Sequence, residues 1–323
     1  MNRPIIQWCV ASAMLAALAT VSRAQAVSPA NPLPTGQLVD VGGYRVHLVC
    51  YGSARSTEPT VLIVGAGASF EWGSVIPAVA TRTRVCAYDH SGTVWSDDGP
   101  TDSCILRVRE VTTALERTGI AGPFVVVGHS VGALVARLFA DRHPDRTAGM
   151  VIVDHAAAFP VQNVSLPEPA APLAATPVIP GHIAQGQRVP IGEAAFAKLP
   201  ATDFALHQWA ASRPRDLASR QRSPSILRGC TAALGSGTSL SEAPLGDRPL
   251  VVLHVNDGEV ISKTAGASPY ARLQQQLAAL SRNSRIVQVD RTSHYIMLDR
   301  PDAVIAALNK TLDQIRAPRD SKR

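Results

Sequence analysis

The feature that most constrains this chain is residues 125–133, with the sequence Val-Val-Val-Gly-His-Ser-Val-Gly-Ala. The apolar start predicts a buried strand, and the apolar pattern of residues 133–140 predicts a helix directly after it. Gly128 and Gly132 lack side chains, so backbone can pass close to backbone in the turn between the two elements. Ser130 then occupies the strained tip of that turn, next to the N-terminus of the helix. A strand, a tight turn and a helix in this order indicate one βα unit of an α/β sheet.

The elements on either side of this unit alternate between strands and helices. Residues 38–41 and 44–50 alternate apolar and polar side chains around Gly42-Gly43, which predicts a β-hairpin. Further strands are predicted at 60–64, 84–88, 148–153, 249–254 and 285–289, and helices at 70–80, 103–118, 270–280 and 301–315. This alternation predicts a mostly parallel sheet covered by helices on both faces, with ligands bound at the carboxyl ends of the strands.

Residues 155–248 interrupt the alternation. Prolines recur along the segment, and short helical stretches are predicted only at 194–199 and 203–212. A loose, Pro-rich, helical insertion between two strands is typical of a cap over a pocket. The chain is therefore predicted to have an α/β core formed by residues 38–154 and 249–316. Residues 155–248 form a cap insertion, and residues 317–323 form a basic tail.

Residues 1–26 predict a signal peptide. They begin with a positive charge, continue with an apolar run of small residues and end in Ala-Gln-Ala, which predicts cleavage between Ala26 and Val27. Polar residues interrupt the apolar run, which disfavours an uncleaved membrane anchor. We expect a secreted or periplasmic protein with no stable membrane insertion after cleavage, in which residues 27–37 form a linker.

The charge of the chain gives no sign of a nucleic-acid partner. The 323 residues carry a formal net charge of +6 and have a pI near 9.3. Basic residues are scattered outside the tail, so a solvated basic surface explains the charge and no nucleic acid is expected to bind. The length suits one large α/β domain with an inserted subdomain.

Cleavage of an ester or amide by a serine needs a base, an acid that orients the base, and donors for an oxyanion. A histidine suited to the role of base lies in residues 292–296, Thr-Ser-His-Tyr-Ile, after the last predicted strand. With this motif the chain resembles the α/β-hydrolase superfamily over residues 38–315, apart from the cap. The resemblance rests on the order of the elements and on Gly128–Gly132, Asp89-His90-Ser91-Gly92 and the His294 loop with Leu298-Asp299-Arg300-Pro301.

The resemblance implies that Ser130 is the nucleophile, at the tip of a nucleophile elbow, and that His294 is the general base. Ser293 stands where the family usually has glycine before the histidine, a small change. His129 is interpreted as only the variable residue of the elbow. His254, at the end of a predicted strand, is the single rival base and ranks far below His294.

Two residues are candidates for the acid. The family usually places it after the strand that follows the cap, where Asp257 lies, although the spacing from Pro249 is one residue short and Gly258 occupies the usual position. Haloalkane dehalogenases and pancreatic-type lipases carry it after the preceding strand, which Asp154 ends in this chain. Both choices keep the order serine, aspartate, histidine. Asp154 is favoured, and Asp257 remains the alternative.

The oxyanion donors implied by the resemblance are two backbone N–H groups. One belongs to Val131, directly after the serine, and the other to Ala66, in the loop after the strand at 60–64. The family often has His-Gly in this loop, where this chain has Val64-Gly65. Losing the histidine leaves the backbone donor available but changes what braces the loop.

Four cysteines remain after signal removal, and in an exported protein they allow two disulfides with three pairings. In the fold that the chain resembles, Cys50 and Cys86 lie near the ends of neighbouring strands. The favoured pairing is therefore Cys50–Cys86 with Cys104–Cys230.

These features predict an exported serine hydrolase that cleaves carboxylic esters of small molecules through a Ser-His-Asp triad and an acyl-enzyme. The same triad also suits a proline-type aminopeptidase, a lactonase, a carbon–carbon hydrolase or an acyltransferase. The cap shows no acidic cluster for a peptide amine, although Glu193 or Asp203 could supply one. A non-catalytic ligand-binding member of the fold is the alternative from another class. No cofactor and no metal are expected.

Overall fold

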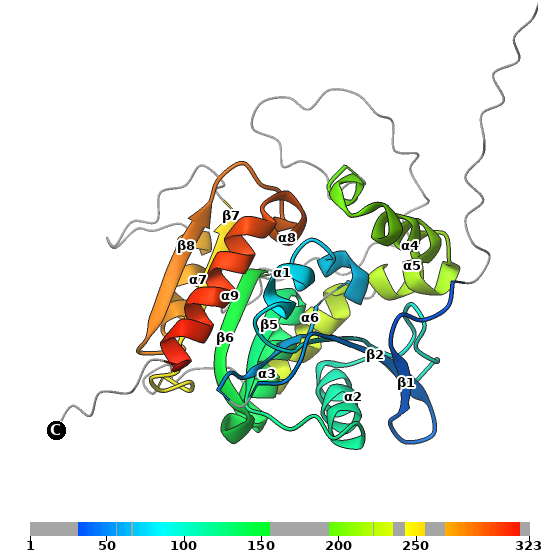
Figure 1. Ribbon diagram of the computed structural model, residues 1–323, viewed down its shortest axis with the longest axis horizontal. Coiled ribbons are helices and arrows are strands. Elements are labelled where there is room, and N and C mark those ends of the chain that lie inside the picture. The colour runs from blue at the N-terminus through cyan, green and yellow to red at the C-terminus, as the bar shows by residue number, and fades with distance from the viewer. Residues whose placement is uncertain are drawn as a thin grey trace, which may run out of the picture.

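The structure is a computed structural model that describes residues 32–55, 57–65, 67–155, 194–221, 223–234, 243–255 and 269–316. At the centre of these residues lies an eight-stranded sheet in the order β1-β2-β4-β3-β5-β6-β7-β8 (Figure 1). The strands are β1 Gln37–Asp40, β2 Arg45–Tyr51, β3 Thr60–Ile63, β4 Val85–Asp89, β5 Phe124–Ser130, β6 Thr147–His155, β7 Leu250–Val255 and β8 Ser284–Val289. β2 is antiparallel to both β1 and β4, and the other neighbours are parallel. The predicted mostly parallel sheet is confirmed.

Helices cover both faces of the sheet (Figure 1). The α-helices are α1 Ile76–Ala80, α2 Cys104–Arg117, α3 Gly132–Arg142, α4 Ala201–Ala211, α5 Pro214–Gln221, α6 Ser223–Ala233, α7 Pro269–Ala278, α8 Ile296–Asp299 and α9 Pro301–Arg316; the 3-10 helices are η1 Ser69–Trp72, η2 Pro144–Arg146 and η3 Phe196–Lys198. Successive valines of β5 face opposite sides, because side chains alternate along a strand. Val125 and Val127 pack in the cluster that contains α1 and α9, whereas Val126 packs with α2, α3 and α6.

The hairpin predicted at the start of the core is present. Gly42 and Gly43 have φ values of 120° and 95°, a region that side-chain-bearing residues rarely adopt. The turn brings β1 against β2 with Asp40 opposite Arg45.

The prediction of a single helix at 70–80 is wrong. The chain forms two short helices there, η1 and α1. Gly73 ends η1, and its N–H donates to the carbonyl of Phe70 at 3.0 Å. A Cβ at Gly73 would lie 1.9 Å from a carboxylate oxygen of Asp203, so the break is packed against α4. Pro77 then stands in the first turn of α1, where the missing N–H costs nothing.

Part of the predicted cap insertion, residues 156–193 and 235–242, lies outside the described residues. The described part forms η3, α4, α5 and α6, of which the last two were not predicted. The prolines of these two helices misled the interpretation, because Pro214 is the first residue of α5 and Pro224 the second residue of α6, positions at which proline does not break a helix. α4 packs against η1 and η3, whereas α6 packs against α2 and α3 of the core.

The loop after β4 is held by the segment at the start of α5. Val94 has a φ of 48°, which is strained for a β-branched residue. Its N–H donates to Asp216 at 2.6 Å, and its carbonyl accepts from Arg213 at 2.6 Å and from Arg215. Both backbone groups of the strained residue are therefore tied to the inserted segment.

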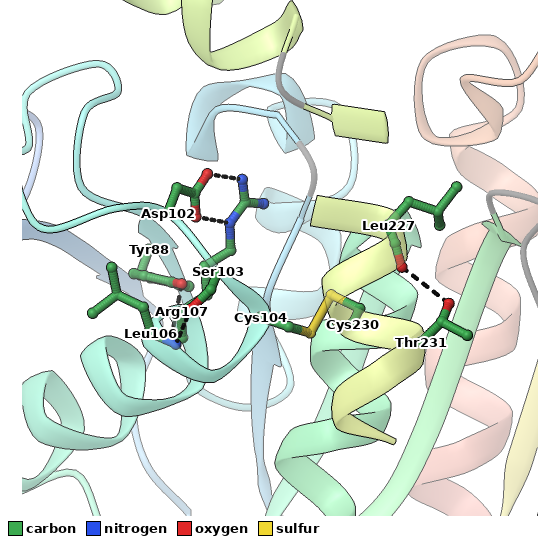
Figure 2. Close-up of a disulfide and its surroundings, with 9 residues drawn as sticks. All are labelled: Tyr88, Asp102, Ser103, Cys104, Leu106, Arg107, Leu227, Cys230 and Thr231. Atoms are coloured by element: carbon green, nitrogen blue, oxygen red, sulfur yellow. Dashed lines mark hydrogen bonds and ion pairs between the residues drawn. A yellow bond between two sulfur atoms is a disulfide. The ribbon is translucent and has the colours of Figure 1, made fainter. Parts of the chain in front are cut away.

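Two disulfides join the pairs favoured from the sequence. Cys50 and Cys86 lie opposite each other on the antiparallel strands β2 and β4. Cys104, the first residue of α2, is bonded to Cys230 of α6, as Figure 2 shows. The second bond fastens the end of the inserted segment to the core.

We expect loss of the Cys104–Cys230 bond to destabilise the protein more than loss of Cys50–Cys86. The bonds close loops with sequence separations of 126 and 36 residues. In the chain-entropy description these loops correspond to about 5 and about 4 kcal/mol of unfolding free energy. Urea unfolding of the two paired Cys→Ala variants without reductant measures the difference; equal stability of the two variants would contradict the prediction.

In the described parts of the chain, no helix combines the length and apolar character needed to cross a membrane. Residues 1–31, which include the predicted signal peptide, lie outside them.

Candidate active site

Ser130 stands at the carboxyl end of β5 in a strained conformation. Its φ is 55°, in the left-handed region that favours glycine. Gly128 makes the turn possible, because a Cβ there would lie 2.5 Å from both the Cα of Ala133 and the carbonyl oxygen of Gly132. Val131 follows as the N-cap of α3, so the serine lies at the positive end of the helix dipole. The structure therefore places a strained serine at the turn between β5 and α3.

Asp154 and His294 lie in direct contact. Nδ1 of His294 is 2.6 Å from Oδ2 of Asp154, although 140 residues separate them in sequence. Asp154 is buried near the end of β6 with a φ of 38°, and its Oδ1 accepts the N–H of Val255 at 3.2 Å. A carboxylate on Nδ1 holds the imidazole in the tautomer that leaves Nε2 as the basic nitrogen. Backbone strain of this kind is concentrated at functional sites.

β5 brings the serine into the neighbourhood of this pair. Ser130 pairs with His155, the residue after Asp154, across a register shift that follows His129. The ring of His129, in turn, lies 4.6 Å from that of His294 between centroids. Ser130 and the Asp154–His294 pair therefore lie at the same end of the sheet.

Of the other residues predicted for the site, two lie outside the described residues, and His254 forms a hydrogen bond to the backbone of its own strand. Asp257 and Ala66 lie outside the described residues. His254 is buried at the end of β7, where its Nδ1 donates to the carbonyl of Val255 at 2.9 Å. The carboxylate of Asp154 contacts His294 at 2.6 Å.

The loop that carries His294 is braced by Asp299. Its Oδ2 accepts hydrogen bonds from the N–H and the hydroxyl of Ser293 at 2.6 and 2.5 Å, and its Oδ1 contacts Lys198 of η3 at 2.5 Å. Burial raises the pKa of Asp299, but the hydrogen bonds from Lys198 and Ser293 outweigh it and hold the pKa below its usual value. The serine that replaces the expected glycine therefore has a structural partner.

A second buried aspartate, Asp89, connects the end of β4 with η1 and β2. Oδ1 and Oδ2 of Asp89, at the end of β4, accept the N–H and hydroxyl of Ser69 at 2.7 and 3.0 Å. Its Oδ2 also lies 2.7 Å from Nδ1 of His47, and both side chains are fully buried. This cluster ties η1 to the sheet and explains the aspartate of the Asp-His-Ser-Gly motif.

His129 has a contact that the sequence did not reveal. Its Nε2 donates to the backbone carbonyl of His294 at 2.9 Å. Burial is the main reason that the pKa of His129 is lowered to about 3, and repulsion from His294 adds to it. A neutral, buried imidazole therefore supports the loop of the candidate base. A single sequence gives no signal for this, because the position is variable in the motif.

We expect His129 to make the protein less stable in acid. An unfolded histidine has a pKa of about 6.5, so between that pH and about 3 the unfolded chain binds a proton that the folded chain does not. Stability should therefore fall as the pH is lowered through this window. His129→Gln keeps an N–H donor but cannot titrate, and its urea midpoint should fall less than that of wild type between pH 7 and pH 4.

His143→Gln is the matched control. Burial also lowers the pKa of His143, but this side chain is only partly buried, so its effect should be smaller. Parallel stability curves for wild type and His129→Gln would contradict the assignment.

No group of three or more histidine, cysteine, aspartate or glutamate side chains that could hold a metal ion occurs among the described residues.

Comparison with known proteins identifies the family. The profile of the alpha/beta hydrolase family matches residues 60–307. An uncharacterized protein of Schizosaccharomyces pombe is 33% identical over 138 residues, covering 34% of this chain and 26% of that protein. A protein of Azorhizobium caulinodans named as a candidate carbamate hydrolase, RutD, is 34% identical over 93 residues, covering 28% of this chain and 34% of the relative. The chain thus matches only about a third or less of the length of these relatives.

Solved structures share the fold at low sequence identity. A proposed ancestral haloalkane dehalogenase is 18% identical, with a TM-score of 0.62 over 87% of this chain and 99% of that one. A thermophilic esterase of Thermogutta terrifontis is 16% identical, with a TM-score of 0.54 over 86% of this chain and 97% of that one. The sheet, the match of the family profile and this shared architecture lead to one conclusion: the chain belongs to the alpha/beta hydrolase family.

Proposed function

We propose that this chain is an exported serine hydrolase that cleaves carboxylic esters of small molecules, with Ser130 as nucleophile, His294 as general base and Asp154 as the acid of the triad. The observation that carries the proposal is the contact of 2.6 Å between His294 Nδ1 and Asp154 Oδ2. It is supported by Ser130, which is held at a φ of 55° at the carboxyl end of β5. A pure binding protein has no need of a strained serine beside an aspartate–histidine pair.

In acylation, the hydroxyl oxygen of Ser130 attacks the ester carbonyl carbon while Nε2 of His294 takes its proton. Asp154 stabilises the imidazolium that forms. The tetrahedral intermediate collapses as His294 gives the proton to the leaving alcohol, which leaves an acyl group on Ser130. Water loses a proton to Nε2 of His294 as it attacks the acyl carbon, which gives a second tetrahedral intermediate. This intermediate collapses as His294 returns the proton to the Ser130 oxygen, and the carboxylic acid and free Ser130 are released.

The oxyanion of each intermediate needs donors placed before the reaction begins. We assign this role to the N–H groups of Val131 and Ala66. The support for Val131 is its position as N-cap of α3, directly after the serine. Each such donor contributes about 2.7–4 kcal/mol to stabilisation of the transition state in serine hydrolases.

The described part of the insertion favours a neutral substrate. η1 and α4 meet through an apolar cluster that includes Phe70, Val94, Leu206 and Trp209. Asp203, considered above as a partner for a peptide amine, packs instead against Gly73, and burial raises its pKa. An ester is therefore preferred to an aminopeptidase substrate, and α4 with α5 is assigned to the cap.

Export is supported by the signal motif ending at Ala26 and by the two disulfides, which persist in oxidising compartments. Mass spectrometry of the protein released by a bacterial host tests it. A first residue at Val27 is expected, and an intact N-terminus in the cytoplasm would reject export.

The decisive experiment combines a fluorophosphonate probe with p-nitrophenyl esters of two, four and eight carbons and a phenyl carbamate. We expect the probe on the peptide that contains Ser130, with faster turnover of the esters than of the carbamate. Preference for the carbamate would replace the ester assignment. Oxidised, folded protein that neither takes the probe nor turns over any substrate would reject the serine hydrolase.

A further inference from the structure

The glycine loop after β3, of which Gly65 and Gly67 are described, packs directly against two side chains of η1. A Cβ at Gly67 would lie 1.7 Å from Oε2 of Glu71, so the carboxylate occupies the space beside the backbone of this glycine. A Cβ at Gly65 would lie 3.2 Å from the indole nitrogen of Trp72. Both side chains are buried, with 3% and 1% of their residues' surface exposed. The backbone of the glycine loop therefore packs against the buried side chains of Glu71 and Trp72.

The carboxylate of Glu71 also contacts the inserted segment. Its Oε1 lies 3.5 Å from Nδ1 of His207 on α4, and the histidine is fully buried. A charged group is costly to bury unless a partner of opposite charge or a hydrogen-bond donor meets it. Glu71 and His207 thus join the glycine loop to α4 over 136 residues of sequence.

His207 extends the contact to the loop of the candidate base. Its ring stacks on Phe196 of η3, with centroids 3.8 Å apart and planes at 11°. Phe196 meets Tyr295 edge-on at 4.7 Å, and Tyr295 directly follows His294. A continuous series of contacts therefore runs from the glycine loop through η1, α4 and η3, in that order, to the histidine loop.

We propose that Glu71 and His207 are positioning residues that fix the glycine loop in place of the histidine that the family often has there. The inference rests on the proposed function, because that loop is the one assigned to the oxyanion. In this proposal α4 belongs to the cap and also holds, through His207, the loop that carries an oxyanion donor. A donor that is displaced by a small distance weakens the transition state more than the neutral substrate, since the oxyanion charge exists only after attack.

The test compares Glu71→Gln and His207→Gln with Glu58→Gln. Glu58 is a matched control, because its buried carboxylate pairs with Arg82 at 2.6 Å and it lies two residues before β3, at the opposite end of that strand. We expect each of the first two variants to lower kcat about 10- to 100-fold with KM within about twofold. Affinity for a phenylboronic acid, which mimics the tetrahedral intermediate, should fall by the same factor as kcat/KM. Glu58→Gln should change only the unfolding midpoint.

The double variant Glu71→Gln/His207→Gln should be no slower than the worse single variant, because the two residues act as one unit. Folded single variants with wild-type kcat would overturn the inference, as would a loss confined to KM. Wild-type protein without probe labelling or turnover would reject the proposed function instead. In that case thermal unfolding of the wild type, the two single variants and the double variant still tests the inference: strictly additive shifts in Tm would show that Glu71 and His207 are not coupled and would overturn the inference by itself.

Discussion

Replacement of Ser130 by alanine is expected to lower kcat/KM for a p-nitrophenyl ester by about 10⁴- to 10⁶-fold. The variant lacks the oxygen that forms the acyl-enzyme, so what remains is catalysis by the oxyanion donors and by binding. The fold should persist, because Ser130 is only partly buried and alanine adopts its φ of 55° with a similar strain. Initial rates, probe labelling and the unfolding midpoint of the purified variant measure these three expectations.

Ser281→Ala is the matched control for this substitution. Ser281 is more buried than Ser130, and its hydroxyl donates to the carbonyl of Arg248 at 2.5 Å, just before β7 at the opposite end of the sheet. Its loss should lower stability without lowering kcat. A Ser130→Ala protein that keeps the wild-type rate, or that still takes the probe, would show that another residue is the nucleophile.

The sheet could be predicted from the sequence because its signals are local. The apolar run of β5, the glycines of the turn and the apolar face of α3 all fall within residues 124–142. The hairpin at Gly42-Gly43 is equally local. The prediction failed where tertiary packing decides, as at Gly73, where contact with Asp203 of α4 accompanies the end of η1. It also failed where prolines begin helices, as at Pro214.

The sequence predicts those candidate residues that lie at or just after the end of a strand, because the ends of parallel strands meet at one edge of the sheet. Asp154 lies at the end of β6 and Asp257 follows β7, two neighbouring parallel strands, so their carboxylates are expected at the same edge and the sequence left both open. Only spatial proximity singles out a residue, and the contact at 2.6 Å involves Asp154. The supports of the site were missed for the same reason: Glu71 and His207 lie far apart in sequence and follow no spacing rule.

Asp154→Asn is the second substitution for which a large effect is expected, a fall in kcat/KM of about 10³- to 10⁴-fold. Asparagine has nearly the same shape, and it tolerates the φ of 38° that this residue adopts. Its side-chain oxygen can still accept the N–H of Val255. It carries no negative charge to stabilise the imidazolium, and its amide can hold His294 in the tautomer whose Nε2 is protonated and cannot accept the proton of Ser130.

Asp257→Asn is the control, and its kcat/KM should remain within about threefold of wild type, because Asp154 already occupies Nδ1 of His294 at 2.6 Å. Both variants should still be folded, and both should be compared from pH 6 to pH 9. If Asp154→Asn keeps its activity and Asp257→Asn loses it, the acid lies after β7 and the contact seen here serves only structure. Similar losses in both variants would show that the two carboxylates share the orientation of the histidine.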